Sequence, residues 1–145
     1  MIANRGEIAL RILRTLRDMG IEAAIIHGKE DRLSLPVMMS DIAYPNYCSN
    51  PLDSYLDIEA IVEAAKEVGA DAVHPGYGFL AENPIFAERL EEEGITFIGP
   101  SADVLRLLGD KIAARDAMVR SGIPVAKGSD GPISDPEEAS IQAAE

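Results

Sequence analysis

Residues 69–84 read GADAVHPGYGFLAENP, and this stretch combines a helix end, a strand, a loop and the start of another helix. The glycine at its beginning ends one helical pattern, and the apolar run 70–74 predicts a strand. A loop with two glycines and a proline follows, and Asn83-Pro84 predicts the next helix start. Open α/β sheets bind ligands in loops at the carboxyl ends of strands. We therefore predict that residues 74–83 form a site.

Helical and extended patterns alternate along the rest of the chain, apart from residues 28–40, which show no clear period. Ser54-x-x-Asp57 fits a capping box ahead of one helix. Strands that alternate with helices of this length predict a parallel sheet with helices on both faces. The predicted strands are 1–3, 21–26, 41–44, 70–74 and 95–98, and the predicted helices are 7–19, 54–69, 83–94, 101–109, 111–120 and 135–145.

The chain changes character after residue 109. Gly109-Asp110 separates two helices, and residues 122–133 hold three glycines and two prolines. A helical pattern then runs over 135–145 and ends without a cap. We expect one domain over residues 1–109 and a truncated second domain over residues 110–145.

Composition excludes several classes of protein. With 145 residues, 47% of them hydrophobic and 26% charged, the chain has enough apolar side chains for a core. No apolar run reaches the roughly 20 residues of a membrane-spanning helix. The formal net charge of −12 disfavours nucleic acid and anionic membranes as partners. A single cysteine, Cys48, excludes an internal disulfide, so we expect a reducing, cytoplasmic setting.

The first predicted turn and the helix after it allow two readings each. The turn 4–7 contains one glycine, so the dinucleotide fingerprint G-x-G-x-x-G is not met, and an ordinary strand-to-helix turn is favoured. Arg11 and Arg14 lie off the apolar stripe of the helix. They fit either a solvated face or a subunit interface.

Three other residues are candidates for chemistry, each with a structural alternative. His74 ends a strand, where a hydrogen-bonded structural role is more common than catalysis. Glu82 is either a functional carboxylate or a charge that stabilises the next helix N-terminus. Lys111, in the first turn of a helix, is either solvated or placed to bind an anion such as phosphate.

Five segments together resemble one family. Residues 3–9 (ANRGEIA), the loop 74–83, Phe97-Ile98-Gly99-Pro100, Gly109-Asp110-Lys111 and Ser129-Asp130-Gly131 occur in the order and at the spacing found in biotin carboxylases. The resemblance covers essentially the whole chain and corresponds to the N-terminal part of that family. The family includes the biotin carboxylase components of acetyl-CoA, propionyl-CoA and pyruvate carboxylases.

The resemblance implies a Rossmann-like pre-ATP-grasp domain at 1–109, followed by the start of an ATP-grasp domain at 110–145. Such proteins convert ATP, bicarbonate and biotin on a carrier protein into carboxybiotin, through carboxyphosphate and with Mg²⁺. A separate carboxyltransferase then selects the final acceptor.

The resemblance also assigns roles to individual residues of the site. Lys111 matches a lysine that contacts ATP phosphate. Tyr77 and Gly78 match the loop that borders the biotin ureido ring, and Glu82 matches an acid near it. It assigns no catalytic residue and no metal ligand to this chain.

Arg11 and Arg14 match positions at the dimer interface of the family, so the resemblance implies a homodimer. Three departures from the family pattern stand out. Ala81 replaces the usual serine, the first strand lacks a few residues before Ile2, and the family's glycine-rich ATP loop and metal-binding acids are absent. Phosphoryl transfer depends on positioning by such groups, so we expect the isolated chain to be inactive.

Two other functions remain open from the sequence. A non-enzymatic module of this fold would only dimerise or dock onto a catalytic subunit. A different ATP-grasp ligase, such as a relative of carbamoyl-phosphate synthetase, would use ammonia or an amine.

Overall fold

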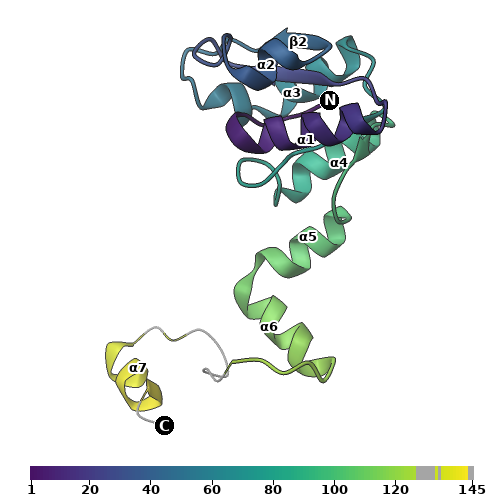
Figure 1. Cartoon of the computed structure of the whole chain (residues 1–145). Helices are drawn as coiled ribbons and strands as arrows, with labels where there is room; N and C mark the ends of the chain where they lie inside the picture. Colours follow the sequence, from purple (N-terminus) through teal and green to yellow (C-terminus); the bar gives the residue numbers. More distant parts are fainter. Residues whose placement is uncertain (127–132, 134, 144–145) are drawn as a thin grey trace. The chain divides into compact units, whose positions relative to one another are not determined.

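The computed structural model describes residues 1–126, 133 and 135–143 (Figure 1). The chain divides into two compact units, Met1–Leu105 and Arg106–Glu145. The first unit contains all the strands of the described residues.

Two pairs of parallel strands form the sheet of the first unit. Strand β1 (Ala24–His27) pairs with β2 (Ile42–Pro45), and β3 (Ala72–Val73) pairs with β4 (Thr96–Phe97). Ile2 joins the two pairs, because it forms parallel bridges to both Ile25 and His74. The spatial order is therefore β2, β1, Ile2, β3, β4. This order reverses direction at the first strand, as in doubly wound α/β folds.

Successive residues of the central strands face opposite sides of the sheet. Ile2 and Ile25 pack in one apolar cluster, whereas their neighbours Ala3 and Ile26 pack in a second one. All four residues of β1 are buried, as expected for a strand covered on both faces. The predicted fold class, a parallel sheet with helices on both faces, is confirmed.

Helices α1 (Gly6–Asp18) and α2 (Leu35–Met39) supply the cluster on one face. Helices α3 (Ile58–Glu67) and α4 (Pro84–Glu92) supply the cluster on the other (Figure 1). Ala9, Ile12 and Leu13 of α1 are buried. Their spacing is that of one helix face, which explains why the sequence predicted this helix well.

Several predicted boundaries were correct because local side chains set them. Asn83 caps α4 by accepting hydrogen bonds from the amides of Ile85 and Phe86, and Pro84 occupies the first helical position. Asp110 caps the helix that follows the predicted break at Gly109-Asp110 in the same way.

Two predictions in the first unit were wrong in detail, and one helix was not predicted. Ser54 does not form the capping box, because it is buried in the short 3₁₀ helix Asp53–Tyr55 (η1), and Asp57 caps α3 instead. The predicted strand 21–26 begins only at Ala24, since Ile21 is exposed. The segment without a clear period contains α2.

The second unit holds helices α6 (Lys111–Arg120) and α7 (Pro136–Ala143). Helix α5 (Ala102–Gly109) contains the division between the two units, which falls after Leu105. The motif Ser129-Asp130-Gly131 lies outside the described residues. Among the residues that are described, no helix is long and apolar enough to span a membrane.

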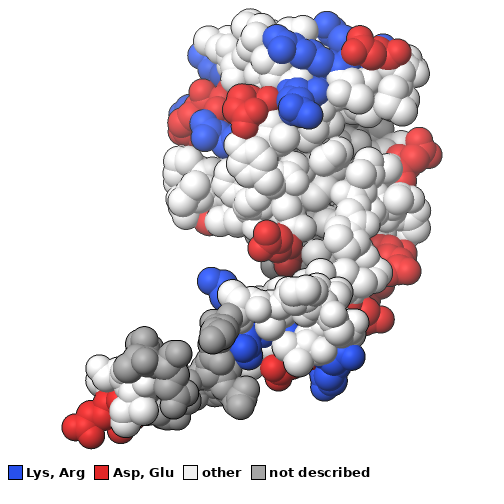
Figure 2. Space-filling model, turned by 60° about the horizontal axis from the view of Figure 1, so that its bottom comes forward, with Lys and Arg blue, Asp and Glu red and all other residues white. Residues whose placement is uncertain are grey.

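On the face drawn in Figure 2, acidic side chains occur over both units, with basic side chains interspersed among them. The negative net charge is therefore not confined to one segment on that face.

Candidate functional site

The candidate site is a groove at the point where the strand order reverses. The loops that follow Ile2 and β3 leave the sheet at the same edge, on either side of this reversal. They enclose a groove of about 400 Å³ lined by Asn4, Arg5, Gly6, Glu7, Ile8, Tyr77, Gly78 and Phe79, which we call the switch-point groove. Doubly wound sheets bind their ligands in such a crevice.

Asn4 connects the two loops. Its side-chain Nδ2 donates hydrogen bonds to the carbonyl oxygens of Pro75 and Tyr77, at 2.7 and 2.9 Å. Its Oδ1 accepts a bond from the backbone amide of Arg5, at 2.8 Å. Asn4 is only 2% exposed, and these bonds satisfy its buried polar atoms.

The loop after β3 has an unusual backbone. Gly76, Gly78 and Phe79 all have positive φ, at 69°, 65° and 42°. A Cβ on Gly76 would lie 2.7 Å from Nδ2 of Asn4, so glycine is required there for space as well as for conformation. Phe79 is the one described non-glycine residue with positive φ, and its ring stacks on Tyr55 with centroids 5.3 Å apart. Strain of this kind is concentrated at functional sites.

Tyr77 and Gly78, two of the residues that the sequence singled out, both line the groove. The Tyr77 side chain is 61% exposed, and its hydroxyl donates a hydrogen bond to the Glu7 carboxylate. This bond raises the pKa of Tyr77 above its ordinary value. Glu82 is exposed in the same loop but is not one of the eight described residues that line the groove.

A charged network lies beside the groove. Arg5 donates two hydrogen bonds to the Asp31 carboxylate, at 2.7 and 2.8 Å. Tyr55 donates its hydroxyl proton to Asp31 at 2.8 Å, and its oxygen accepts a bond from the Gly28 amide at 3.0 Å. The hydrogen bond from Arg5 holds the pKa of Asp31 below its usual range. Burial raises the pKa of Tyr55 to about 12. Both groups therefore keep fixed protonation states at neutral pH.

His74 is a structural residue in this geometry. Its Nδ1 accepts a hydrogen bond from the Gly76 amide at 3.0 Å, which requires the neutral ring. Burial lowers the pKa of His74 below its ordinary value, so the neutral form is favoured. The imidazole thus supports the turn into the loop.

Lys111 lies in the second unit, at the first position of α6. Its side chain is exposed, and the adjacent cap, Asp110, accepts hydrogen bonds from the amides of Ile112 and Ala113. Lys111 belongs to the unit Arg106–Glu145, whereas Tyr77 belongs to the unit Met1–Leu105.

Arg11 and Arg14 lie on the exposed side of α1, opposite the buried Ile12 and Leu13. Their exposure fits both the solvated face and the subunit interface that the sequence left open.

Sequence reasoning did not single out Asn4, Asp31 or Tyr55. Asn4 and Tyr77 are 73 positions apart, so no local pattern connects them. Two signals were available for this part of the site: an asparagine in the first strand-to-helix turn and two glycines in the later loop. These two signals indicate a shared site only once the two loops are known to be neighbours in the fold.

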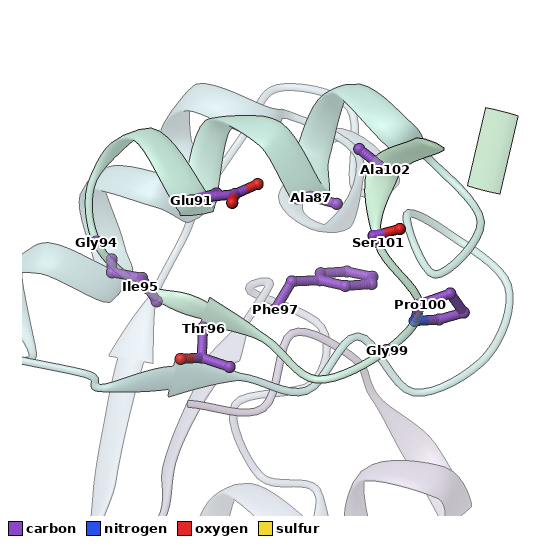
Figure 3. Close-up of a pocket in the computed structure, with 10 residues that line it drawn as sticks. All are labelled: Ala87, Glu91, Gly94, Ile95, Thr96, Phe97, Gly99, Pro100, Ser101 and Ala102. Carbon is purple, nitrogen blue, oxygen red and sulfur yellow. The ribbon is translucent and has the colours of Figure 1, made fainter. Parts of the chain in front are cut away.

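A second hollow, of about 430 Å³, lies between α4, β4 and the start of α5 (Figure 3). The Phe97 ring lies among its labelled residues and meets Phe86 edge-on, with centroids 5.9 Å apart. A Cβ on Gly99 would lie 2.4 Å from that ring. These ring contacts pack β4 against α4. We therefore assign the residues around the hollow a structural role.

Comparisons of the sequence and of the structure with known proteins identify the same family. The family model for the N-terminal domain of biotin carboxylase matches residues 1–105, which include both loops of the switch-point groove. The biotin carboxylase of Pseudomonas aeruginosa is 50% identical over 144 residues, covering 97% of this chain and 31% of the relative.

Two solved structures are similar over 99% of this chain. One is the dimer of the biotin carboxylase domain of Hydrogenobacter thermophilus 2-oxoglutarate carboxylase, with MgADP, ADP and bicarbonate. Its TM-score is 0.90 at 50% identity, and 31% of that chain is covered. The other is a β-γ-ATP complex of Campylobacter jejuni biotin carboxylase, with a TM-score of 0.91 at 43% identity and 32% coverage. The chain thus spans about a third of the length of the relatives it matches.

Proposed function

Because the chain belongs to the biotin carboxylase family through its N-terminal domain, we propose that it forms one wall of a site that carboxylates biotin. In this reaction a bicarbonate oxygen attacks the γ-phosphorus of ATP, which gives carboxyphosphate and releases ADP. The biotin ureido nitrogen then bonds to the carboxyl carbon as the bond from that carbon to the phosphate oxygen breaks, and the phosphate that leaves takes up the ureido proton.

One observation carries this proposal: the family match spans both loops that form the switch-point groove. We propose that Tyr77 and Gly78 border the biotin ring, since both line the groove. Glu82, exposed in the same loop, is proposed as an acid near that border.

We assign Lys111 to a phosphate of ATP. The exposure of its side chain at the first position of α6 supports this, since a lysine ammonium binds phosphate as a point charge. Mg²⁺ would neutralise charge on the transferred phosphoryl group. The described part of the chain has no group of three or more His, Cys, Asp or Glu side chains that could hold a metal, so we assign Mg²⁺ to none of its residues.

The remaining assignments concern organisation and partners. We propose that residues 110–145 begin an ATP-grasp domain and that Arg11 and Arg14 take part in a homodimer interface. The dimer of the Hydrogenobacter thermophilus domain supports the second point. A biotin carrier protein or domain and a carboxyltransferase are the proposed partners, and the cytoplasm is the proposed location.

The test uses a hybrid enzyme in which residues 1–145 replace the matched segment of Pseudomonas aeruginosa biotin carboxylase. We expect this hybrid to transfer label from bicarbonate to free biotin only when ATP is present. A folded, dimeric hybrid that releases phosphate without labelling biotin would overturn the proposal. Carbamoyl phosphate formed from ammonia would instead support a different ATP-grasp ligase.

The role of Lys111 has its own control in the same helix. Lys111→Met in the hybrid should raise the KM for ATP by about tenfold, the equivalent of about 1.4 kcal/mol of binding free energy. Arg120→Met removes an exposed cation from the opposite end of α6 and should leave the KM for ATP unchanged. An equal change in the KM for ATP in both variants would refute the assignment of Lys111 to an ATP phosphate.

A further inference from the structure

We propose that Asn4 is a positioning residue that sets the shape of the biotin-facing loop. This inference rests on the proposed function for the identity of the ligand, whereas the anchoring contact is a property of this chain. Asn4 belongs to the first strand-to-helix turn, and the loop it holds lies more than 70 positions later in the chain.

The contacts of Asn4 act on the backbone of the loop. Pro75 and Tyr77, whose carbonyl oxygens accept its two bonds, flank Gly76 on either side. The amide therefore fixes the peptide group before Gly76, which has φ of 69°, and the peptide group between Tyr77 and Gly78. The next residue with positive φ, Gly78, follows directly and lines the groove.

An asparagine side chain matches this position chemically. Its NH₂ group has two donors for two carbonyls, and its oxygen accepts the Arg5 amide. Aspartate would keep that acceptor but place a second oxygen against the two carbonyls. Alanine would leave these three buried or partly buried backbone groups without this partner.

His74 also holds the loop backbone, because its Nδ1 accepts a bond from the Gly76 amide, which belongs to the same peptide group as the Pro75 carbonyl. Two further contacts hold side chains of the loop. Tyr77 is bonded through its hydroxyl to Glu7, which is exposed. Phe79 is held through its ring by the stack on Tyr55. Without Asn4, the ring of Tyr77 stays tethered and His74 still holds the peptide group before Gly76, but the peptide group between Tyr77 and Gly78 loses the side chain that fixes it. The ligand border at Gly78 then loses its shape.

The first test follows amide hydrogen exchange of residues 76–80 in the chain itself. We expect Asn4→Asp to accelerate this exchange, whereas Asn46→Asp does not. Asn46 is the matched control, because its Nδ2 donates to the carbonyl of Ser54 at 3.0 Å, and it does not line the groove. Unchanged exchange in a folded Asn4→Asp chain would refute the anchoring role.

The second test measures kinetics in the hybrid enzyme. We expect Asn4→Asp to raise the KM for biotin by about tenfold, equivalent to about 1.4 kcal/mol. The KM for ATP and the biotin-independent hydrolysis of ATP should stay within about twofold, because a loss confined to binding of one substrate raises its KM. Asn46→Asp should change none of these values.

The two proposals fail in different ways. If the unsubstituted hybrid does not carboxylate biotin, the proposed function fails, and hydrogen exchange still decides whether Asn4 anchors the loop. If that hybrid is active and Asn4→Asp lowers activity towards ATP and biotin equally, the positioning role is overturned. Should Asn4→Asp fail to fold, Gly76→Ala perturbs the same contact from the loop side and must give the same rise in the KM for biotin.

Discussion

Gly76→Ala tests the close contact between the two loops of the switch-point groove. Gly76 has φ of 69°, and an added Cβ would lie 2.7 Å from Nδ2 and 3.0 Å from Cγ of Asn4. The substitution therefore combines backbone strain with displacement of a buried amide.

The structure gives a magnitude for each part. A left-handed backbone costs a non-glycine residue about 1–2 kcal/mol. Displacement of Asn4 would weaken or break its two hydrogen bonds to loop carbonyls, each of which contributes about 0.5–1.5 kcal/mol net to stability. We expect Gly76→Ala to lower the free energy of unfolding by about 2–5 kcal/mol.

Gly78→Ala is the matched control. Gly78 has nearly the same φ, 65°, but no atom lies within 4 Å of an added Cβ. Gly78→Ala should lower the free energy of unfolding only by the cost of the left-handed backbone, about 1–2 kcal/mol. The difference between the two variants therefore isolates the contact with Asn4.

The assay is urea unfolding of the chain followed by tyrosine fluorescence. The chain has four tyrosines and no tryptophan, and all four tyrosines lie in the unit Met1–Leu105. The signal therefore reports the unit that contains the groove. Equal losses for Gly76→Ala and Gly78→Ala would refute the reasoning. So would full additivity of Gly76→Ala with Asn4→Ala, because truncating Asn4 removes the atoms that the new Cβ would meet.

Three further predictions concern single side chains. Burial raises the pKa of Tyr55 to about 12, so its stabilising effect is complete below pH 10 and is lost as the pH rises towards 12. Phenolate absorbance should show one tyrosine that titrates late, and this signal should be absent in Tyr55→Phe. The same substitution should lower the free energy of unfolding in urea by about 1–3 kcal/mol, because the Gly28 amide loses its partner. Burial lowers the pKa of His74, so stability present above pH 6.5 should fall as the pH drops from 6.5 towards the lowered value; the same decline in His74→Gln would contradict this. Arg14→Glu should convert the hybrid dimer to monomers in sedimentation velocity, and an unchanged dimer would exclude Arg14 from the interface.

Much of the secondary structure followed from the sequence because its signals are local. Asn83 and Asp110 cap helices by bonding to amides two and three residues ahead, so their spacing could be read directly. The buried face of α1 followed from the spacing of its apolar residues.

The same local reasoning failed at Ser54, which has the spacing of a capping box. Ser54 is 1% exposed and packs against Gly28, where an added Cβ would lie 3.1 Å from its hydroxyl. Tertiary packing thus directs this side chain inward, and Asp57 takes the cap.

The sequence by itself determined the family, the alternation of strands and helices, and the loop that carries Tyr77 and Gly78. Only the tertiary structure decided that this loop faces the first turn and that Asn4 holds it there. The physical reason is the parallel sheet. The segment around Ile2 lies between β1 and β3, so the carboxyl ends of distant strands come together. Hydrogen bonds across that edge depend on strand order, which no local spacing specifies.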